Sequence, residues 1–191
     1  IKNALIQKLD SGKNVYGTCI TSTGPLWPRA AKTAGLDFVF IDTEHVPLDR
    51  NELTLLCQNF TAEGIVPIVR IPSPDPFRAC QAIDGGAAGI VMPYIESRSQ
   101  VEDLVGAVKY RPLKGALLAA YIKGTKEMPE NLQQYISTFN QGNICIANIE
   151  SVPAMEKLKE ILSVTGLDGV FIGPHDLSVS LGLPEQYDHP D

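Results

Sequence analysis

The chain has 191 residues, of which 44% are hydrophobic and 20% are charged. This composition is that of a globular protein and argues against a disordered or fibrous chain. Its 16 basic and 22 acidic side chains give a net charge of −6, which argues against nucleic-acid binding, and no apolar run approaches the roughly 18 residues of a membrane span. We expect a single domain over residues 1–191.

The N-terminus and the cysteines indicate where the protein works. Residues 1–8 alternate charged and apolar side chains, which predicts an amphipathic helix and not a signal peptide. The four cysteines form no Cys-x-x-Cys pair; they are Cys19, Cys57, Cys80 and Cys145. Widely spaced cysteines in a chain of this size are typical of reduced thiols, so we expect a cytoplasmic protein.

Short apolar runs recur along the chain at intervals of about 25 residues, each followed by a helical pattern. The runs begin near Val15, Phe38, Ile65, Gly89, Gly115, Ile144 and Gly169. Continuous apolar strands belong to parallel sheets that are covered on both faces. The pattern therefore predicts seven strands of a parallel α/β fold.

The segments between the strands begin with helix-start signals. Residues 49–52 read Asp-Arg-Asn-Glu, residues 74–76 read Pro-Asp-Pro, and residues 151–153 read Ser-Val-Pro. Each places a capping side chain or a proline where a helix begins. Three helices are expected to end at a glycine that leads into the next strand, in AGLDFVFID, GGAAGIVMP and TGLDGVFIG.

A doubly wound sheet and a (β/α)8 barrel both fit this alternation. Seven strands and the lack of a Gly-x-Gly-x-x-Gly phrase after the first strand favour the barrel. The strand interval places strand eight near position 195, past the last residue. We therefore predict an α/β fold, a (β/α)8 TIM barrel, with strand eight and the C-terminal helix missing from this chain.

Polar side chains gather where the predicted strands end, which is where a barrel carries its chemistry. These positions hold Thr21-Ser22-Thr23, Asp42-Thr43-Glu44-His45, Arg70, Pro93-Tyr94, Asn148-Ile149-Glu150 and Gly173-Pro174-His175-Asp176. Each has an ordinary structural role as an alternative. The carboxylates can cap the following helices, the histidine can be a polar loop residue, and the arginine can serve in a structural ion pair.

The combination of these residues is more specific than any one of them, because four charged types at one rim are costly to bury unpaired. Glu150 and Asp176 on neighbouring strands offer oxygen ligands to Mg²⁺ or Mn²⁺. Arg70 suits a carboxylate or an enolate oxygen, and a neutral His45 completes a proton-transfer set.

With these residues in place, the chain resembles the HpcH/HpaI aldolase family of class II pyruvate aldolases. The matching phrases are FVFIDTEHVPLD, IVPIVRIPSPDP, GAAGIVMPYIES, NIESVPAM and DGVFIGPHDLSVSLG. They run in order over nearly the whole chain. The resemblance implies a (β/α)8 barrel that uses Mg²⁺, Mn²⁺ or Co²⁺ and binds pyruvate as the enolate donor, in a cytoplasmic homo-oligomer.

The resemblance also implies roles for single residues. Glu150 and Asp176 would be the metal ligands, and Arg70 would hold the pyruvate carbonyl oxygen. His45 would be the acid–base group, with Asp84 raising its basicity and Asp42 nearby. The backbone around Pro174, His175 and Asp176 would bind the pyruvate carboxylate.

Three positions depart from the family pattern. Asn148 stands where the family carries a longer glutamine, His175 replaces a small residue, and KYRPLKGALLAAY lacks an Arg-Gly loop after the expected strand five. The implied function is a metal-dependent aldolase that cleaves a 4-hydroxy-2-oxo acid into pyruvate and an aldehyde. The alternatives are a related enolate-forming lyase or decarboxylase acting on oxaloacetate or an acyl-CoA thioester, and a non-enzymatic scaffold subunit.

Overall fold

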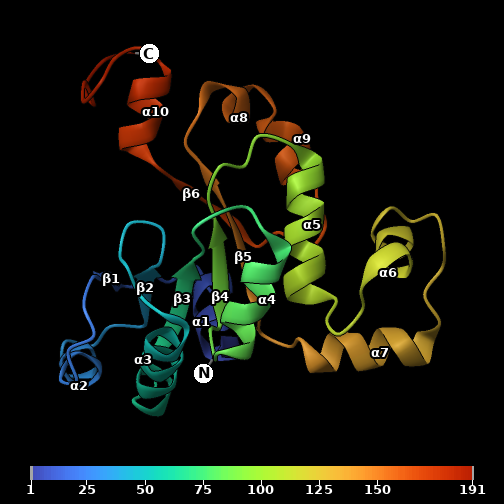
Figure 1. Ribbon diagram of the computed structural model, residues 1–191, viewed down its shortest axis with the longest axis horizontal. Helices are drawn as coiled ribbons and strands as arrows, with labels where there is room; N and C mark the ends of the chain where they lie inside the picture. The colour runs from blue at the N-terminus through green and yellow to red at the C-terminus, as the bar shows by residue number, and fades with distance from the viewer. Residues whose placement is uncertain (1, 191) are drawn as a thin grey trace.

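The computed structural model describes residues 2–190, in which helices and parallel strands alternate (Figure 1). The strands are β1 (Gly17–Ile20), β2 (Phe38–Asp42), β3 (Val66–Arg70), β4 (Gly89–Met92), β5 (Ile144–Ile149) and β6 (Gly169–Ile172). The helices are α1 (Lys2–Asp10), α2 (Trp27–Thr33), α3 (Arg50–Ala62), α4 (Pro76–Asp84), α5 (Arg98–Lys109), α6 (Gly115–Ile122), α7 (Glu130–Phe139), α8 (Val152–Glu156), α9 (Leu158–Leu162) and α10 (Pro174–Ser180). Within residues 2–190, none of these helices has the length and apolar character that crossing a membrane requires.

The strands form one parallel sheet in chain order, β1 to β6, which is a barrel-like half-circle and not a closed ring. The predicted α/β class and parallel sheet are confirmed. The register pairs Asp42 with Arg70, so the two predicted site residues end neighbouring strands side by side. The expected strand eight lies outside the described residues and stays a prediction.

The predicted strand at residues 115–121 is wrong, because this segment is the helix α6. Alanine and leucine are strong helix formers, and the run GALLAAY has no β-branched residue to favour a strand. The sheet therefore passes directly from β4 to β5, with Gly89 paired to Ile144. Glycine is needed at position 89, since a Cβ there would lie 2.9 Å from the Ile144 Cβ.

The main core lies between the outer face of the sheet and helices α3, α4, α5 and α9. Alternate strand residues such as Val39, Ile41 and Val69 point into it and are fully buried. The predicted helix start at residue 49 is confirmed. The Asp49 side chain accepts hydrogen bonds from the N–H groups of Asn51 and Glu52 at 2.7 and 2.9 Å, and Glu52 accepts one from Asp49 N–H in return.

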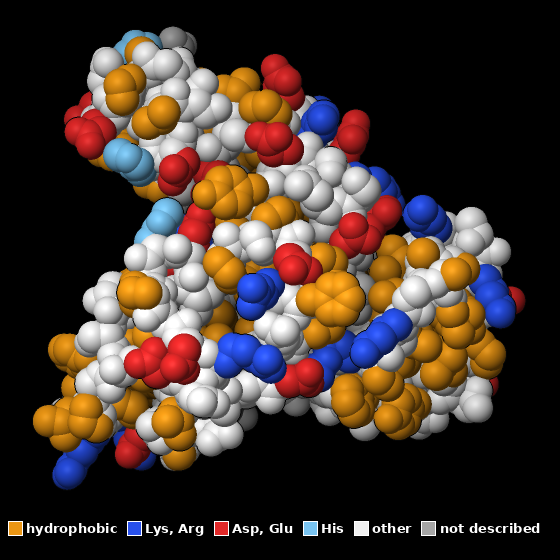
Figure 2. Space-filling model, viewed as in Figure 1, with side chains coloured by type: hydrophobic (Ala, Val, Ile, Leu, Met, Phe, Trp, Pro, Cys, Tyr) orange, Lys and Arg blue, Asp and Glu red, His pale blue; other side chains and the backbone are white. Residues whose placement is uncertain are grey.

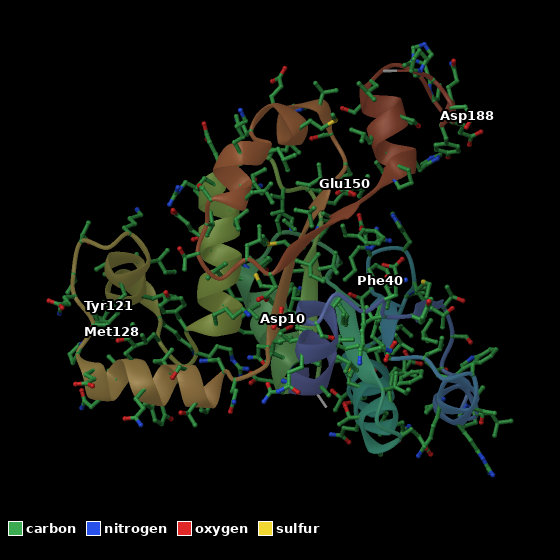
Figure 3. All side chains as sticks on the ribbon, turned by 180° about the vertical axis from the view of Figure 1, so that it is seen from behind. Asp10, Phe40, Tyr121, Met128, Glu150 and Asp188 are labelled. Atoms are coloured by element: carbon green, nitrogen blue, oxygen red, sulfur yellow. The ribbon has the colours of Figure 1, made fainter. Side chains whose placement is uncertain are left out.

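The inner face of the sheet carries the other set of alternate side chains. Figures 1 and 3 show α1 lying across this face, opposite α3–α5, and Leu5 of α1 packs there against Ile68 and Ile144. A cavity of about 670 Å³ opens between α1 and the inner face. Phe40 of β2 stacks on Phe171 of β6 across it, with ring centroids 5.4 Å apart.

This alternation positions the site. Phe38 and Phe40 face inward on β2, so Asp42 faces inward at the end of the same strand. Arg70 follows Ile68 on β3 in the same way, and Asn148 continues the inward set of β5. The inner face thus changes from apolar to charged at the C-terminal ends of the strands.

Candidate active site

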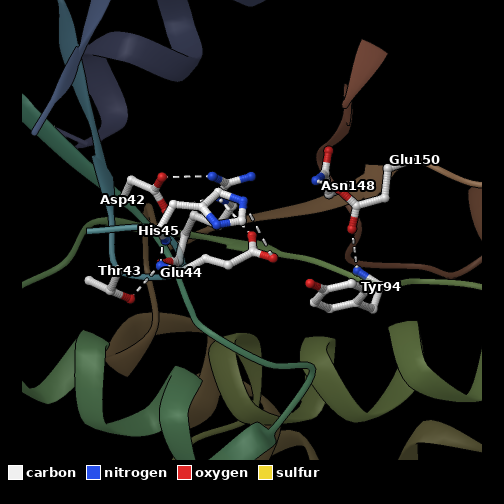
Figure 4. A network of polar contacts seen from close by, with 8 residues as sticks. Asp42, Thr43, Glu44, His45, Tyr94, Asn148 and Glu150 are labelled. Carbon is white, nitrogen blue, oxygen red and sulfur yellow. Dashed lines mark hydrogen bonds and ion pairs between the residues drawn. The ribbon is translucent and has the colours of Figure 1, made fainter. Parts of the chain in front are cut away.

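The charged side chains predicted at the strand ends form two groups around the mouth of the half-barrel (Figure 4). The arginine side consists of Asp42, Glu44, His45 and Arg70 from the ends of β2 and β3. The glutamate side consists of Tyr94, Asn148, Glu150 and Asp176 from the ends of β4, β5 and β6. Figure 2 shows this mouth as a hollow beside the lobe that α10 forms, bordered by acidic and histidine side chains.

Arg70 is the centre of the arginine side. Its Nε and Nη2 donate to the two carboxylate oxygens of Asp42 at 3.0 and 2.7 Å, and Nε also lies 3.1 Å from Glu44 Oε2. The side chains are buried, with only 12% of Arg70 and 8% of each carboxylate exposed. The structural ion pair considered for Arg70 is therefore present, and it fixes the plane of the guanidinium.

The pKa values on this side reflect the pairing. Burial acts to raise the pKa of Asp42, but hydrogen bonds from Arg70 and from Glu44 N–H outweigh it and hold the pKa below its ordinary value. Burial acts to lower the pKa of Arg70, and the contact with Asp42 raises it above its ordinary value. Both groups therefore stay charged.

His45 stands at the open edge of the arginine side. Its side chain is 64% exposed, and its Nε2 lies 3.9 Å from Glu44 Oε1. The His45 backbone N–H points to Asp42 Oδ1 at 3.4 Å, which holds the loop after β2 against the strand. An exposed imidazole beside a buried carboxylate is placed to exchange a proton with a bound molecule.

Glu150 is the centre of the glutamate side, and no cation among residues 2–190 forms an ion pair with it. Its carboxylate is buried and accepts hydrogen bonds from Tyr94 N–H at 2.7 Å and from the Asn148 side-chain amide. Burial, and after it the charges of Glu44 and Asp176, raise the pKa of Glu150, against the lowering effect of Tyr94 N–H and Arg70. The negative charge here is therefore only partly compensated.

The glutamate side fits a hard divalent cation. The Asn148 Oδ1 atom is buried and has no hydrogen-bond partner among the described residues, and it lies next to the incompletely compensated Glu150 carboxylate. Oxygen donors of this kind suit Mg²⁺ or Mn²⁺. Within residues 2–190, no group of three or more His, Cys, Asp or Glu side chains converges on a metal position. A cation here would therefore take Glu150, Asp176 and non-acidic oxygens.

The segment after β6 approaches Glu150 closely. Gly173 N–H donates to Ile149 O at 3.0 Å, and a Cβ on Gly173 would lie 3.0 Å from the Glu150 Cβ. The lack of a side chain at Gly173 thus lets Pro174 and Asp176 begin α10 at the edge of the site. His175 is exposed on α10, with Nδ1 3.4 Å from the Tyr187 hydroxyl.

The structure does not place Asp84 against His45 within the described residues. Asp84 ends α4, is largely exposed and pairs with Arg111. The carboxylate beside His45 is Glu44. The predicted support of His45 by Asp84 therefore rests on the family resemblance and not on a contact.

Sequence patterns place two further site residues, Glu44 and Tyr94, at the rim but give neither a catalytic or binding role, and Glu44 only the alternative of a helix cap. A hydrogen bond to Glu44 above all, followed by the charge of Glu44, raises the pKa of Tyr94. The phrase Asp-Thr-Glu-His is the sequence signal for Glu44, because it places a second carboxylate directly after the strand that ends at Asp42. No sequence pattern predicts that the backbone N–H of Tyr94 donates a hydrogen bond to Glu150.

A parallel half-barrel with charged residues at the carboxyl ends of its strands is the arrangement of α/β-barrel enzymes. Comparison with known proteins identifies the group: residues 17–191 match the HpcH/HpaI aldolase/citrate lyase family. The chain belongs to this family. Its family and its named aldolase relatives class it as a carbon–carbon lyase.

Three similar proteins support this assignment. The 2-dehydro-3,6-dideoxy-6-sulfogluconate aldolase of Pseudomonas putida is 33% identical over 175 residues, covering 92% of this chain and 68% of the relative. The 2-keto-3-deoxy-L-rhamnonate aldolase of Salmonella gallinarum is 30% identical over 191 residues, covering 100% and 71%. The crystal structure of the HpcH/HpaI aldolase from Desulfitobacterium hafniense superposes with a TM-score of 0.81 at 32% identity, covering 97% of this chain and 72% of that one.

Proposed function

We propose that the protein is a metal-dependent aldolase that cleaves a 4-hydroxy-2-oxo acid into pyruvate and an aldehyde. The observation that carries this proposal is the pairing of a buried, fixed arginine with a buried, incompletely compensated glutamate across one hollow. A cation-stabilised enolate needs both a positive group for its oxygen and a site for a metal. The family relatives named as aldolases of 2-oxo sugar acids support the same chemistry.

The metal would be held by Glu150 and Asp176, with Mg²⁺, Mn²⁺ or Co²⁺ as the candidates. When bound, such an ion supplies electron withdrawal from the oxygens of the 2-oxo acid. Asn148, which holds Glu150 through its amide, is the candidate side chain for a further substrate contact. The backbone at Pro174, His175 and Asp176 is the candidate binding segment for the substrate carboxylate.

Arg70 would stabilise the enolate oxygen. Asp42 and Glu44 contact the Nε and Nη2 atoms of Arg70. These contacts leave Nη1 as the guanidinium nitrogen that would bind a substrate oxygen. Because Asp42 and Glu44 already fix the guanidinium, a substrate oxygen would meet a preorganised donor. In cleavage the C3–C4 bond breaks, its electron pair passes into the enolate, and C4 becomes the aldehyde carbon.

His45 would accept the proton that leaves the 4-hydroxyl group in this step. Its exposed ring lies at the edge of the same hollow, beside Glu44, which can orient it. Protonated His45 would then return the proton when the enolate becomes pyruvate. Asp84 remains a candidate for an indirect effect on His45 from the end of α4.

Several broader features belong to the same proposal. We propose that residues 1–191 act as one domain and supply six strands of a (β/α)8 barrel, which would need two more strands, the predicted strand eight among them, and a C-terminal helix. The apolar side chains exposed on the edge strand β6, Val170, Phe171 and Ile172, support further packing there and a homo-oligomer.

Four free cysteines support a reducing, cytoplasmic location.

The test is pyruvate release from a panel of 4-hydroxy-2-oxo acids, coupled to lactate dehydrogenase, with and without EDTA. We expect turnover that EDTA abolishes and Mn²⁺ restores. Glu150→Gln should lack this activity, while Glu160→Gln on the exposed face of α9 serves as the matched control and should keep it. Turnover of oxaloacetate without any aldol cleavage would instead favour the decarboxylase alternative, and folded, metal-loaded protein without either activity would contradict both.

A further inference from the structure

Tyr94 has a backbone conformation that few aromatic residues adopt. It follows β4 with φ at 55°, in the left-handed region. In this conformation its N–H donates to Glu150 Oε1 at 2.7 Å, and its carbonyl accepts from Gln100 Nε2 at 3.2 Å. Such conformations persist only where surrounding contacts hold them, and here those contacts are the candidate metal ligand and the start of α5.

The Tyr94 ring lies between the two sides of the site. Its hydroxyl points toward Glu44 of the arginine side, while its backbone N–H donates to Glu150 of the glutamate side. Figure 4 shows the ring spanning the gap between these two carboxylates. Even so, 54% of Tyr94 is exposed, so an aromatic residue is open to solvent beside these carboxylates. A molecule bound between Arg70 and Glu150 would contact it.

The charges around this ring are of one sign. The charged groups that act on the Tyr94 hydroxyl are Glu44, Glu150 and Asp176. Among the described residues, the cation that acts on Glu150 is Arg70, which already pairs with Asp42 and Glu44. In Figure 2, acidic and histidine side chains border the hollow, and the lysine and arginine side chains of that face lie away from it.

We propose that Tyr94 is a specificity-determining residue and that the enzyme uses an uncharged aldehyde, one without a carboxylate, sulfonate or phosphate group. The inference rests on the proposed aldolase function. Arg70 and a divalent cation would together serve the pyruvate part of the substrate. The aldehyde part then meets the Tyr94 ring and the Glu44 carboxylate, where an apolar or hydroxylated chain is accepted and a second anion is repelled.

The experiment measures aldol addition of pyruvate to two aldehydes of four carbons each, uncharged butanal and anionic succinic semialdehyde, in the Mn²⁺-loaded protein. We expect kcat/KM to favour butanal by at least about tenfold, because Asp42 and Glu44 share the single positive charge of Arg70 and leave one negative charge beside the ring when the metal is bound. Tyr94→Arg should lower this ratio by about tenfold or more, since it replaces the ring with a cation. Tyr94→Phe keeps the ring and should keep the preference for butanal.

Tyr135→Arg is the matched control, because Tyr135 is 53% exposed on α7, outside the site, and the change adds the same charge. It should leave the ratio unchanged. Exchange of the pyruvate C3 protons with deuterated water reports enolate formation in every variant, before any aldehyde reacts. If exchange occurs but succinic semialdehyde is used as well as butanal, or if Tyr94→Arg changes the ratio no more than Tyr135→Arg does, the specificity inference is overturned while the aldolase proposal stands. If the wild-type protein shows no exchange and no cleavage, the proposed function fails, and this inference fails with it.

Discussion

Each side of the hollow carries one aspartate and one glutamate, but these carboxylates are paired with a cation on the arginine side and only partly compensated on the glutamate side. On the arginine side, two buried carboxylates share one buried guanidinium, and each charge has a partner within 3.1 Å. On the glutamate side, Glu150 is equally buried, but within residues 2–190 its carboxylate has only N–H donors as partners. Burial, and after it the charges of Glu44 and Asp176, raise the pKa of Glu150.

From this difference we infer that the two sides would bind different parts of a ligand set: the arginine side would bind a substrate oxygen, and the glutamate side would bind a cation. On the arginine side the charges are already paired in the protein alone, so its geometry is fixed before a substrate arrives, although Glu44 Oε2 accepts no hydrogen bond within residues 2–190. The glutamate side keeps an incompletely compensated charge and an unpartnered Asn148 oxygen, which a divalent cation would satisfy together. We infer that the first side is preorganised for the enolate and the second is organised by the metal.

The largest effect is expected from Arg70→Lys. Lysine keeps the positive charge but lacks the planar fork that contacts Asp42 and a substrate oxygen together. Turnover should fall by several hundred-fold, as when an oxyanion donor is removed, with exchange of the pyruvate C3 protons falling alongside. Arg98→Lys is the control, since Arg98 pairs with Glu102 on α5 outside the site. An Arg70→Lys enzyme within threefold of the wild type would contradict a role for the guanidinium fork.

A somewhat smaller effect, about 100-fold on aldol cleavage, is expected from His45→Ala, because a positioned general base typically contributes this much. Oxaloacetate decarboxylation should suffer less, since loss of CO₂ requires no hydroxyl deprotonation. The ratio of the two rates, measured with the same Mn²⁺ concentration, separates the roles. Equal losses in both reactions would show that His45 is not the base for the 4-hydroxyl group.

Glu44 and Asp84 provide a direct comparison of two carboxylates near His45. Glu44 is buried and contacts Arg70 and His45, whereas Asp84 is exposed and paired with Arg111. Glu44→Gln should reduce kcat for cleavage by roughly tenfold or more, and Asp84→Asn by about twofold or less, because positioning groups act through contact. A larger loss in Asp84→Asn would restore the role that the family resemblance implies for it.

The smallest predicted effect is on stability, and its dependence on pH has opposite signs on the two sides. The lowered pKa of Asp42 means that its charged form stabilises the fold above the ordinary value of 3.8, and that this stabilisation is lost as the pH falls below it. The raised pKa of Glu150 means that metal-free protein loses stability as the pH rises above 4.5. We expect Asp42→Asn to lower the free energy of unfolding at pH 7 by about 1–3 kcal/mol.

Glu150→Gln should not lower the free energy of unfolding at pH 7 in EDTA, and any gain over the wild type should vanish by pH 4. Urea unfolding at the two pH values measures both variants. Similar destabilisation by both substitutions at pH 7 would show that the Glu150 charge is compensated after all.

Most of the fold could be predicted from the sequence because each strand is an apolar run between helix signals. The runs near Phe38, Ile65 and Ile144 are rich in Val and Ile, and strands lie there. The run at Gly115 was predicted wrongly, since a short apolar segment does not by itself distinguish a strand from a helix.

The site was predictable as a set of strand ends but not as a set of contacts. Asp42 and Arg70 could be placed on one rim, yet their shared hydrogen bonds depend on the register of β2 and β3. The left-handed backbone of Tyr94 has no sequence signal, because that conformation is characteristic of glycine and rarely of an aromatic residue. Asp84 could be assigned only by resemblance, and its partner Arg111 comes from a loop whose course the sequence does not specify.

The most direct test of the central claim is a calorimetric titration with Mn²⁺ of metal-free wild-type protein, Glu150→Gln and Asp42→Asn. Both substitutions remove one buried carboxylate charge from the same hollow, but only Glu150 lies on the glutamate side. We predict one Mn²⁺ bound by the wild type, affinity reduced at least about 100-fold in Glu150→Gln, and affinity within a few-fold of the wild type in Asp42→Asn. Unchanged binding in Glu150→Gln, or equal losses in the two variants, would contradict the assignment of the metal to the glutamate side.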